Sequence, residues 1–278
     1  MEEKSSLPPL LYKYESFNNY SISNLKNGQI FFNRPIDFND PFDCSLYVES
    51  MKYEDDDIVN LWNDWYLGKL PDAPSPPSPQ AKTVDSIDDI PDEFKNVVYK
   101  TAKEVAENKQ AEYLYNIGCC CFSEINNNLL MWSHYSGGHR GFCLEFDMSF
   151  DPFKKAFKVE YSDSFPRWNP INILQERKSF DRRGLIPLLT KYSCWAYEKE
   201  WRIFHREPRK LYGYEIEALK AVYFGANIDR AHLEIVCLIL QGQNPDVIFY
   251  KAKKSSDKYE IEFEKFSYIP YTKINKKS

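Results

Sequence analysis

Residues 119–146 read CCCFSEINNNLLMWSHYSGGHRGFCLEF. Two apolar runs, at 119–123 and 141–146, enclose a polar middle and have the length and composition of strands. Between them, LLMWSHY at 129–135 predicts a short helix that ends at Gly137 and Gly138. This strand–helix–strand unit holds two of the four histidines and four of the seven cysteines. We predict that the rest of the chain is organised around it.

A second stretch, WAYEKEWRIF at 195–204, alternates charged and aromatic residues and predicts a strand that lies near the first unit. Period-two alternation places Glu198, Glu200 and Arg202 on one face, with the carboxylates about 6.5–7 Å apart. Arg202 would hold one carboxylate ionised and oriented. Such a carboxylate stabilises positive charge that develops at a sugar carbon. The pattern is also typical of a solvent-exposed face, where a Glu–Arg pair contributes under about 1 kcal/mol.

The remaining segments predict short strands with helices between them and at one end. Further strands are expected at 10–14, 29–33, 156–161, 218–224, 247–250 and 259–266, and helices at 21–26, 171–191 and 229–240. This order indicates an α+β fold with mixed, mostly antiparallel sheets and flanking helices. We expect one domain, 1–278, with a helical, Pro-rich insertion at 54–117. Its helices, near 58–65 and 91–115, flank PDAPSPPSP at 71–79.

Composition narrows the class of protein. A net charge of −5 gives no global attraction to nucleic acid or to an anionic membrane. No apolar run is long enough to span a bilayer, the first residues do not form a signal peptide, and the seven cysteines are not spaced as a disulfide framework. A cytoplasmic location and no membrane partner are therefore expected. In Cys119–Cys121, adjacent side chains point to opposite strand faces, which argues against a shared zinc site.

Four polar residues of the 119–146 stretch allow two interpretations each. His134 and Tyr135 are placed to contact a ligand, Tyr135 by stacking on a flat ring, but they equally fit a hydrogen-bonded core around Trp132. His139 lies in a glycine-rich loop that either approaches a ligand or forms an exposed turn. Ser123 would line a pocket or cap the turn that follows it.

Five stretches resemble, in this order, a widespread bacterial family of domains of unknown function. They are LYKY at 11–14, FNDPFD at 38–43, CFSE at 121–124, LLMWSHYSGGHRGFCLEF at 129–146 and YEKEWRIF at 197–204. The resemblance spans residues 11–266 apart from the Pro-rich insertion. The family looks similar in layout to the ADP-ribosyltransferase-like enzymes. That similarity implies a split sheet of their type and NAD as the substrate that is consumed.

The resemblance also implies roles for particular residues. Glu200 takes the position of the catalytic glutamate, and Glu198 completes an ExE pair. Ser123 takes the position of the middle-strand serine. The first-strand position falls on Tyr12 or Lys13, where such enzymes usually have His or Arg, and this departure puts the carry-over in doubt there.

Residues without a counterpart in those enzymes would complete the contacts to NAD. His134 and Tyr135 would contact the ribose and the nicotinamide, and Arg202 would orient the glutamate pair.

Three functions remain open on the sequence. The first is an NAD-dependent ADP-ribosyltransferase-like enzyme that modifies a protein or nucleic acid, as a bacterial toxin or phage-defence effector. The second is a non-enzymatic sensor or interaction module that binds a nucleotide or a phage protein. The third is a metal-dependent nuclease that uses acidic residues, namely Asp40, Asp43, Glu198 and Glu200.

Overall fold

The computed structural model describes residues 6–45, 54–70, 82–166 and 185–270. The chain divides into two units. The first comprises Met1–Phe38, Asn116–Tyr161 and Ser193–Ser278, and the second Asn39–Tyr115 and Ser162–Tyr192. The fold is α+β, and the residues predicted for an NAD site all belong to the first unit.

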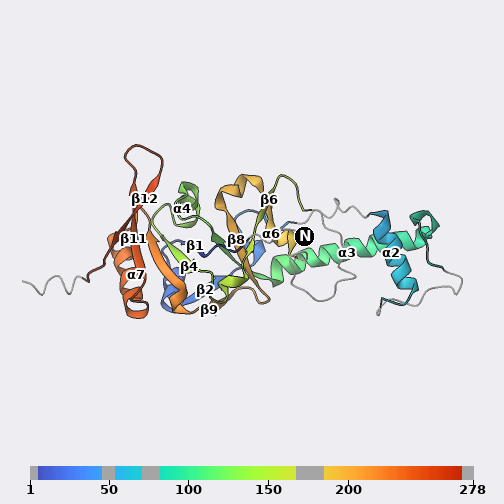
Figure 1. Ribbon diagram of the computed structural model, residues 1–278, viewed down its shortest axis with the longest axis horizontal. Helices are drawn as coiled ribbons and strands as arrows, with labels where there is room; N and C mark the ends of the chain where they lie inside the picture. Colours follow the sequence, from blue (N-terminus) through green and yellow to red (C-terminus); the bar gives the residue numbers. More distant parts are fainter. Residues whose placement is uncertain (1–5, 46–53, 71–81, 167–184, 271–278) are drawn as a thin grey trace, which may run out of the picture. The chain divides into compact units, whose positions relative to one another are not determined.

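An eight-stranded sheet forms the centre of the first unit (Figure 1). Its strands, in spatial order, are β12 (Ile261–Phe266), β11 (Ile248–Lys254), β10 (Leu219–Phe224), β4 (Phe142–Asp147), β1 (Leu10–Glu15), β3 (Gly118–Ser123), β8 (Glu200–His205) and β5 (Phe157–Lys158). Every pairing is antiparallel except β10 with β11, which are joined by helix α7 (Arg230–Gln243). A tight turn reverses the chain direction and so joins antiparallel strands. A parallel pair therefore needs a longer crossover connection such as α7. The sheet is therefore mixed and mostly antiparallel, as predicted.

One face of this sheet carries the main apolar core, and we call it the helical face. Helices α1 (Asn19–Lys26) and α7 pack on it through Leu25, Val236 and Leu240. The small sheet of β2 (Gln29–Phe32) and β9 (Lys210–Gly213) adds Ile30 and Phe32 to the same core. Asp229 caps α7 by accepting a hydrogen bond from the backbone N–H of Ala231 at 2.7 Å.

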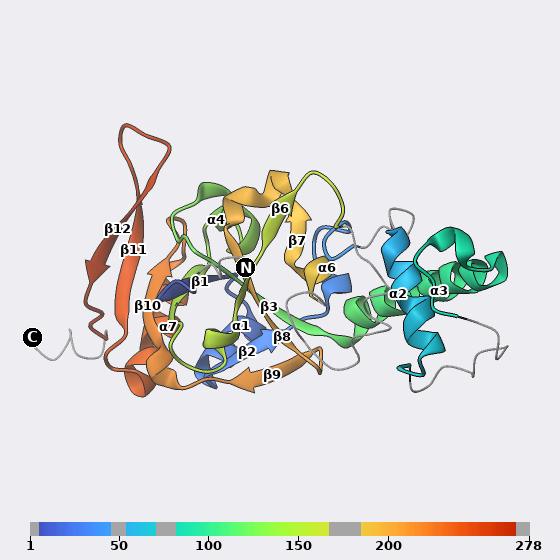
Figure 2. The same ribbon diagram turned by 45° about the vertical axis from the view of Figure 1, so that its right-hand side comes forward.

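The other face, which we call the polar face, is covered by helix α4 (Leu129–Tyr135), with the predicted bounds. Asn128 caps α4 by accepting from the backbone N–H groups of Leu130 and Met131. Trp132 is fully buried, and its ring lies edge-on to Tyr14 of β1 at 5.3 Å. This contact seats α4 on the sheet. Figure 2 shows that the β11–β12 hairpin extends past the strands beside it.

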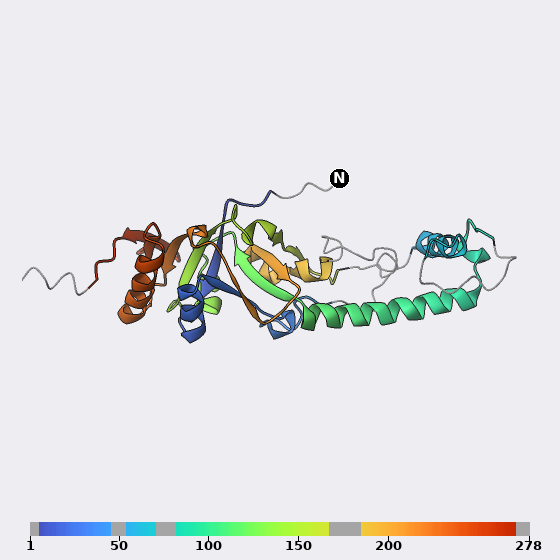
Figure 3. The same ribbon diagram turned by 90° about the horizontal axis from the view of Figure 1, so that it is seen from below.

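The second unit has a small core of its own. Helix α2 (Asp55–Tyr66) and the helix α3 (Asp92–Asn116) bury Ile58, Trp62 and Val98 together with Ile90. Figure 3 shows α3 as one continuous helix. Both helices were predicted from their apolar spacing. The unit also contains α6 (Ile186–Leu189) and β7 (Thr190–Tyr192).

Two sequence predictions were wrong in detail. The strand predicted at 195–204 begins only at Glu200, because Ser193–Glu198 forms a 3-10 helix and Lys199 adopts a left-handed φ of 44°. The strand predicted at 156–161 is broken into β5 and β6 (Glu160–Ser162). Strand β9 was not predicted. Most of the helix predicted at 171–191 lies outside the described residues, and its last part forms α6 and β7.

Among the described residues, no helix combines the length and the apolar composition needed to cross a bilayer.

Substitution by alanine should change the free energy of unfolding in opposite directions at two glycines, Gly141 and Gly242. A Cβ at Gly141 would lie 2.0 Å from the backbone oxygen of Glu15, where β4 begins its pairing with β1. Gly141→Ala should therefore lower the free energy of unfolding by about 1–3 kcal/mol or more. A Cβ at Gly242 in α7 meets nothing within 4 Å, so Gly242→Ala should raise it by about 0.5–1 kcal/mol. Urea unfolding measures both changes, and equal values for the two variants would contradict the expected order.

Candidate functional site

A row of polar side chains crosses the polar face through four adjacent strands. Glu200 of β8 lies opposite Ser123 of β3, Ser123 opposite Tyr12 of β1, and Tyr12 opposite Glu145 of β4. Their apolar neighbours in sequence belong to the helical-face core, so alternation turns the row toward the polar face. We call these four residues the polar row. It brings three predicted site residues, from three separate stretches, into one line.

Glu200 and Arg202 form a buried, two-point ion pair at one end of the row. The Arg202 Nε lies 2.7 Å from Glu200 Oε1, and the second guanidinium bond, to Oε2, is 3.0 Å long. Glu200 is 4% exposed and Arg202 is fully buried. The predicted pairing is confirmed, and the solvent-exposed alternative is wrong. A buried charge pair is stable only when both groups keep their partners.

Glu198 reaches the same region from a different element. It ends the 3-10 helix, and the left-handed Lys199 then turns the chain into β8. The Tyr135 hydroxyl donates to Glu198 Oε1 at 2.6 Å, and the Ser123 hydroxyl donates to the Glu198 backbone oxygen at 2.5 Å. Glu198 is 2% exposed. The two glutamates therefore do not share a strand face, but hydrogen bonds to α4 and β3 hold Glu198 beside the polar row.

The far end of the row is a carboxylate surrounded by tyrosines. The Tyr223 hydroxyl donates to Glu145 Oε2 at 2.7 Å, and the rings of Tyr12 and Tyr223 meet edge-on at 6.0 Å. Tyr250 stacks on Tyr223 at 4.7 Å. Burial, and then the Glu145 charge, raise the pKa of Tyr12 above its ordinary value, and burial with the hydrogen bond to Glu145 does the same for Tyr223. Both phenols therefore remain protonated donors at neutral pH.

The sequence left Tyr12 and Lys13 as alternatives for the first-strand position, but in the structure they lie on opposite faces of the sheet. Tyr12 packs with the polar-face cluster, whereas its neighbour Leu11 is in the helical-face core. Alternation places Lys13 on the helical face, where its Nζ lies 3.2 Å from Glu15 Oε1. Burial alone would lower the pKa of Lys13, but the charge and hydrogen bond of Glu15, together with the nearby Cys120 and Cys121, outweigh burial and raise the pKa. Lys13 thus stays charged and takes no part in the polar row.

The two histidines of the 119–146 stretch differ. His134 is exposed at the end of α4, and its ring lies 6.2 Å from that of Tyr135 and 6.3 Å from that of Trp195. His139 has a left-handed φ of 64°, stacks near Trp132 and lies 3.2 Å from the Ser133 hydroxyl. Its position against the core favours a structural role over a ligand contact. His134 keeps access to solvent at the edge of the candidate site.

Residues of the site that had no sequence prediction include Glu145, Phe38 and Tyr161. Glu145 could have been found from alternation in GFCLEF. The Phe38 ring, whose centroid is 5.6 Å from the Arg202 guanidinium carbon, and the Tyr161 hydroxyl, which accepts the Glu200 backbone N–H at 2.8 Å, could not. Both contacts join segments far apart in the sequence. Cation–π contact favours keeping the Arg202 charge inside the protein.

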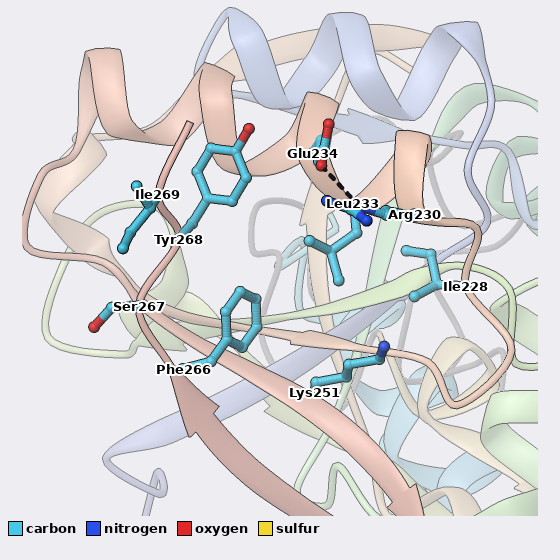
Figure 4. Close-up of a pocket in the computed structure, with 9 residues that line it drawn as sticks. All are labelled: Ile228, Arg230, Leu233, Glu234, Lys251, Phe266, Ser267, Tyr268 and Ile269. Atoms are coloured by element: carbon cyan, nitrogen blue, oxygen red, sulfur yellow. Dashed lines mark hydrogen bonds and ion pairs between the residues drawn. The ribbon is translucent and has the colours of Figure 1, made fainter. Parts of the chain in front are cut away.

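A surface pocket of about 330 Å³ lies away from the polar row, between α7 and the β11–β12 hairpin (Figure 4). Its walls combine apolar and charged side chains, from Leu233 and Phe266 to Lys251 and the Arg230–Glu234 pair. Leu233 and Phe266 pack on the helical-face core, so the pocket and the polar row lie on opposite faces. No residue of the polar row lines the pocket.

No group of three or more His, Cys, Asp or Glu side chains in the described part of the chain is arranged to hold a metal ion. Asp43 pairs instead with Lys191 inside the second unit, with 3.5 Å between Oδ2 and Nζ. The acidic residues considered for a nuclease site therefore do not form a metal-ligand cluster.

A family model described as Protein of unknown function (DUF2971) matches residues 131–203. This range is about a quarter of the chain and runs from α4 into β8. It contains Tyr135, Glu198, Glu200 and also Glu145 of β4, but not Tyr12 of β1 or Ser123 of β3, which precede it in the chain. The match supports a family of unknown function, as the sequence motifs suggested. Neither the curated proteins nor the solved structures gave a significant match.

The Glu200–Arg202 pair should show strong coupling in a double-mutant cycle. Arg202→Gln or Glu200→Gln alone leaves one buried charge without its main partner, so each should cost roughly 3–5 kcal/mol of unfolding free energy. The double variant should cost clearly less than the sum. Arg230→Gln, at an exposed pair with Glu234, is the control and should cost under about 0.5 kcal/mol. Additive effects at Glu200 and Arg202 would show that the pair is not coupled.

His139 should make stability depend on pH. Burial, and then the charge of Lys254, lower the pKa of His139 in the folded protein. The unfolded chain then binds the proton more readily, so stability should fall as the pH drops below about 6.5, the pKa of a free imidazole. His139→Asn, which tolerates the left-handed backbone, should flatten this decrease. Thermal melting between pH 7.5 and pH 5 measures it, and identical slopes would exclude His139 as the source.

Proposed function

We propose that the protein is an ADP-ribosyltransferase-like enzyme that consumes NAD and transfers ADP-ribose to a protein or nucleic acid. One observation carries the proposal: Tyr12, Ser123 and Glu200 lie in register on three adjacent strands and on one face. The sequence resemblance assigned Ser123 and Glu200 to two of these positions, and Tyr12 or Lys13 to the third. Residues from unrelated stretches would not otherwise be expected to line up in this way.

Transfer of ADP-ribose from NAD requires a carboxylate that stays ionised while positive charge develops on the ribose. Arg202 supplies two charge-assisted hydrogen bonds to Glu200, and these bonds keep the carboxylate charged and fixed in direction. A fixed charge needs no reorganisation when the transition state forms, and in a buried site its effect is larger than in water. Glu200 is therefore assigned to stabilise the cationic ribose.

In the proposed reaction, the bond between the nicotinamide nitrogen and the ribose carbon breaks, and nicotinamide leaves with the bonding electrons. Glu200 stabilises the resulting positive charge on the ribose. The acceptor nucleophile then bonds to the same carbon, and Glu198 takes up the proton that the acceptor loses. Tyr135, which already donates to Glu198, holds this carboxylate in place and offers a ring for stacking. No metal is required in this sequence of steps.

The burial of both glutamates favours a second candidate. Glu198 and Glu200 are at most 4% exposed, and both are already hydrogen-bonded inside the protein. A scaffold whose carboxylates serve only its own stability would act as a non-enzymatic sensor that binds a nucleotide or a protein. For the enzyme, the same burial means that the site must open before NAD reaches Glu200.

Nicotinamide release from NAD separates these two candidates. The wild-type protein should release nicotinamide, and Glu200→Gln should lower the rate by roughly 10²-fold or more, because the charge that stabilises the transition state is lost. Glu264→Gln, on the exposed edge strand β12, is the control and should leave the rate unchanged. Far-ultraviolet circular dichroism establishes that each variant is folded.

A second variant tests the site without leaving a buried charge unpaired, so it is useful if Glu200→Gln does not fold. Ser123→Ala removes the hydroxyl that bonds the Glu198 backbone without leaving a buried charge, and it should also slow the reaction. NAD binding without turnover, unchanged by Glu200→Gln, would support the sensor. Absence of NAD binding would reject the enzyme class.

A further inference from the structure

Strand β3 carries three consecutive cysteines whose environments differ sharply. Cys120 packs in the helical-face core, and burial raises the pKa of its thiol to about 12. Alternation turns Cys119 and Cys121 to the polar face, where their sulfur atoms lie 3.9 Å apart. Cys119 is 2% exposed, whereas Cys121 is partly open to solvent. One strand thus pairs two neighbouring thiols and places an inert third on its other face.

We infer that Cys119 and Cys121 form a redox-active dithiol that reacts with hydroperoxides. This modification site does not depend on the proposed NAD chemistry. The class of oxidant follows from the residues, because two thiols in contact supply the two electrons that reduction of a peroxide consumes.

The reaction proceeds in two steps. The sulfur of Cys121, the more accessible thiol, attacks one peroxide oxygen and the O–O bond breaks, which gives a sulfenic acid at Cys121 and releases water or an alcohol. The sulfur of Cys119 then attacks the Cys121 sulfur, a disulfide forms, and the sulfenic oxygen leaves as water. Two thiols are oxidised and one peroxide is reduced.

Strand geometry indicates that this disulfide would be labile. Residues two apart in a strand have Cα atoms about 6.4–6.8 Å apart, which is the upper end of the range that a disulfide spans. Closing the bond must therefore pull β3 away from ideal geometry. Strained disulfides are reduced easily and are the ones used for regulation.

The position of β3 means that such strain would reach the candidate site. Strand β3 pairs with β8 over six residues, and Cys121 lies directly opposite Arg202. Arg202 in turn holds Glu200. Oxidation of the dithiol should consequently loosen the pairing of β3 with β8 and lower the stability of the folded protein.

Mass spectrometry tests the inference in a Cys194→Ser parent, since Cys194 is the exposed thiol and would otherwise react first. After treatment with hydrogen peroxide and alkylation, the tryptic peptide 110–140 contains all three cysteines of β3. We expect it to lose two hydrogens, to carry one alkyl group, at Cys120, and to recover on treatment with dithiothreitol. The oxidised protein should also show a lower Tm that the same reductant restores.

Single variants identify the pair. Cys120→Ser should still form the disulfide, whereas Cys119→Ser and Cys121→Ser should not, and Cys119→Ser should accumulate the sulfenic acid at Cys121. In the Cys194→Ser parent, phenylarsine oxide, which condenses with two neighbouring thiols and releases water, should block the oxidation; this result needs no substitution in β3. A disulfide that survives Cys119→Ser, or oxidation of Cys121 to the sulfinic acid without a disulfide, would overturn the inference.

Discussion

A sheet that is covered on both faces must satisfy its polar side chains inside the protein, and this constraint governs the first unit. The central strands β1, β3 and β8 bury one face in the helical-face core, and β1 buries its other face against α4, where Tyr14 meets Trp132. A charged residue on such a strand is stable only with a partner at hydrogen-bond distance. Glu200 therefore has Arg202 and Lys13 has Glu15, and Glu198, which precedes β8, has Tyr135.

The constraint also explains why the polar face differs in character from the helical face. The helical face is filled by large apolar side chains in contact, among them Phe146 and Phe153 with rings 4.5 Å apart. The polar face combines Trp132 and the tyrosines with a continuous row of hydrogen-bonding groups. Tyrosine suits this mixture because its ring packs in the core while its hydroxyl reaches a carboxylate, as Tyr223 does with Glu145.

At Glu200, the hydrogen bonds that stabilise the folded protein compete with those that a ligand would make. The bidentate bond to Arg202 keeps the carboxylate charged without water, but it also occupies both oxygens that a ligand would need. A firmly held ion pair is consistent with both proposed functions: it would orient the carboxylate in an enzyme, and it would stabilise the sheet in a non-enzymatic sensor. The dithiol of β3 lies directly beside this pair, so the strand that supports Glu200 is also the strand whose covalent state can change.

The sequence by itself determined the elements whose signal is local. Apolar spacing and capping residues identified α4, α2, α3 and α7, and alternation identified most strands, because each signal depends on neighbours within one or two turns. Alternation also separated Cys120 from Cys119 and Cys121. Only the tertiary structure decided that Tyr12, and not Lys13, joins Ser123 and Glu200, since strand register is set by pairing between distant segments. It also showed that Glu198 precedes β8 across the left-handed Lys199, because a single backbone turn leaves no trace in a period-two pattern.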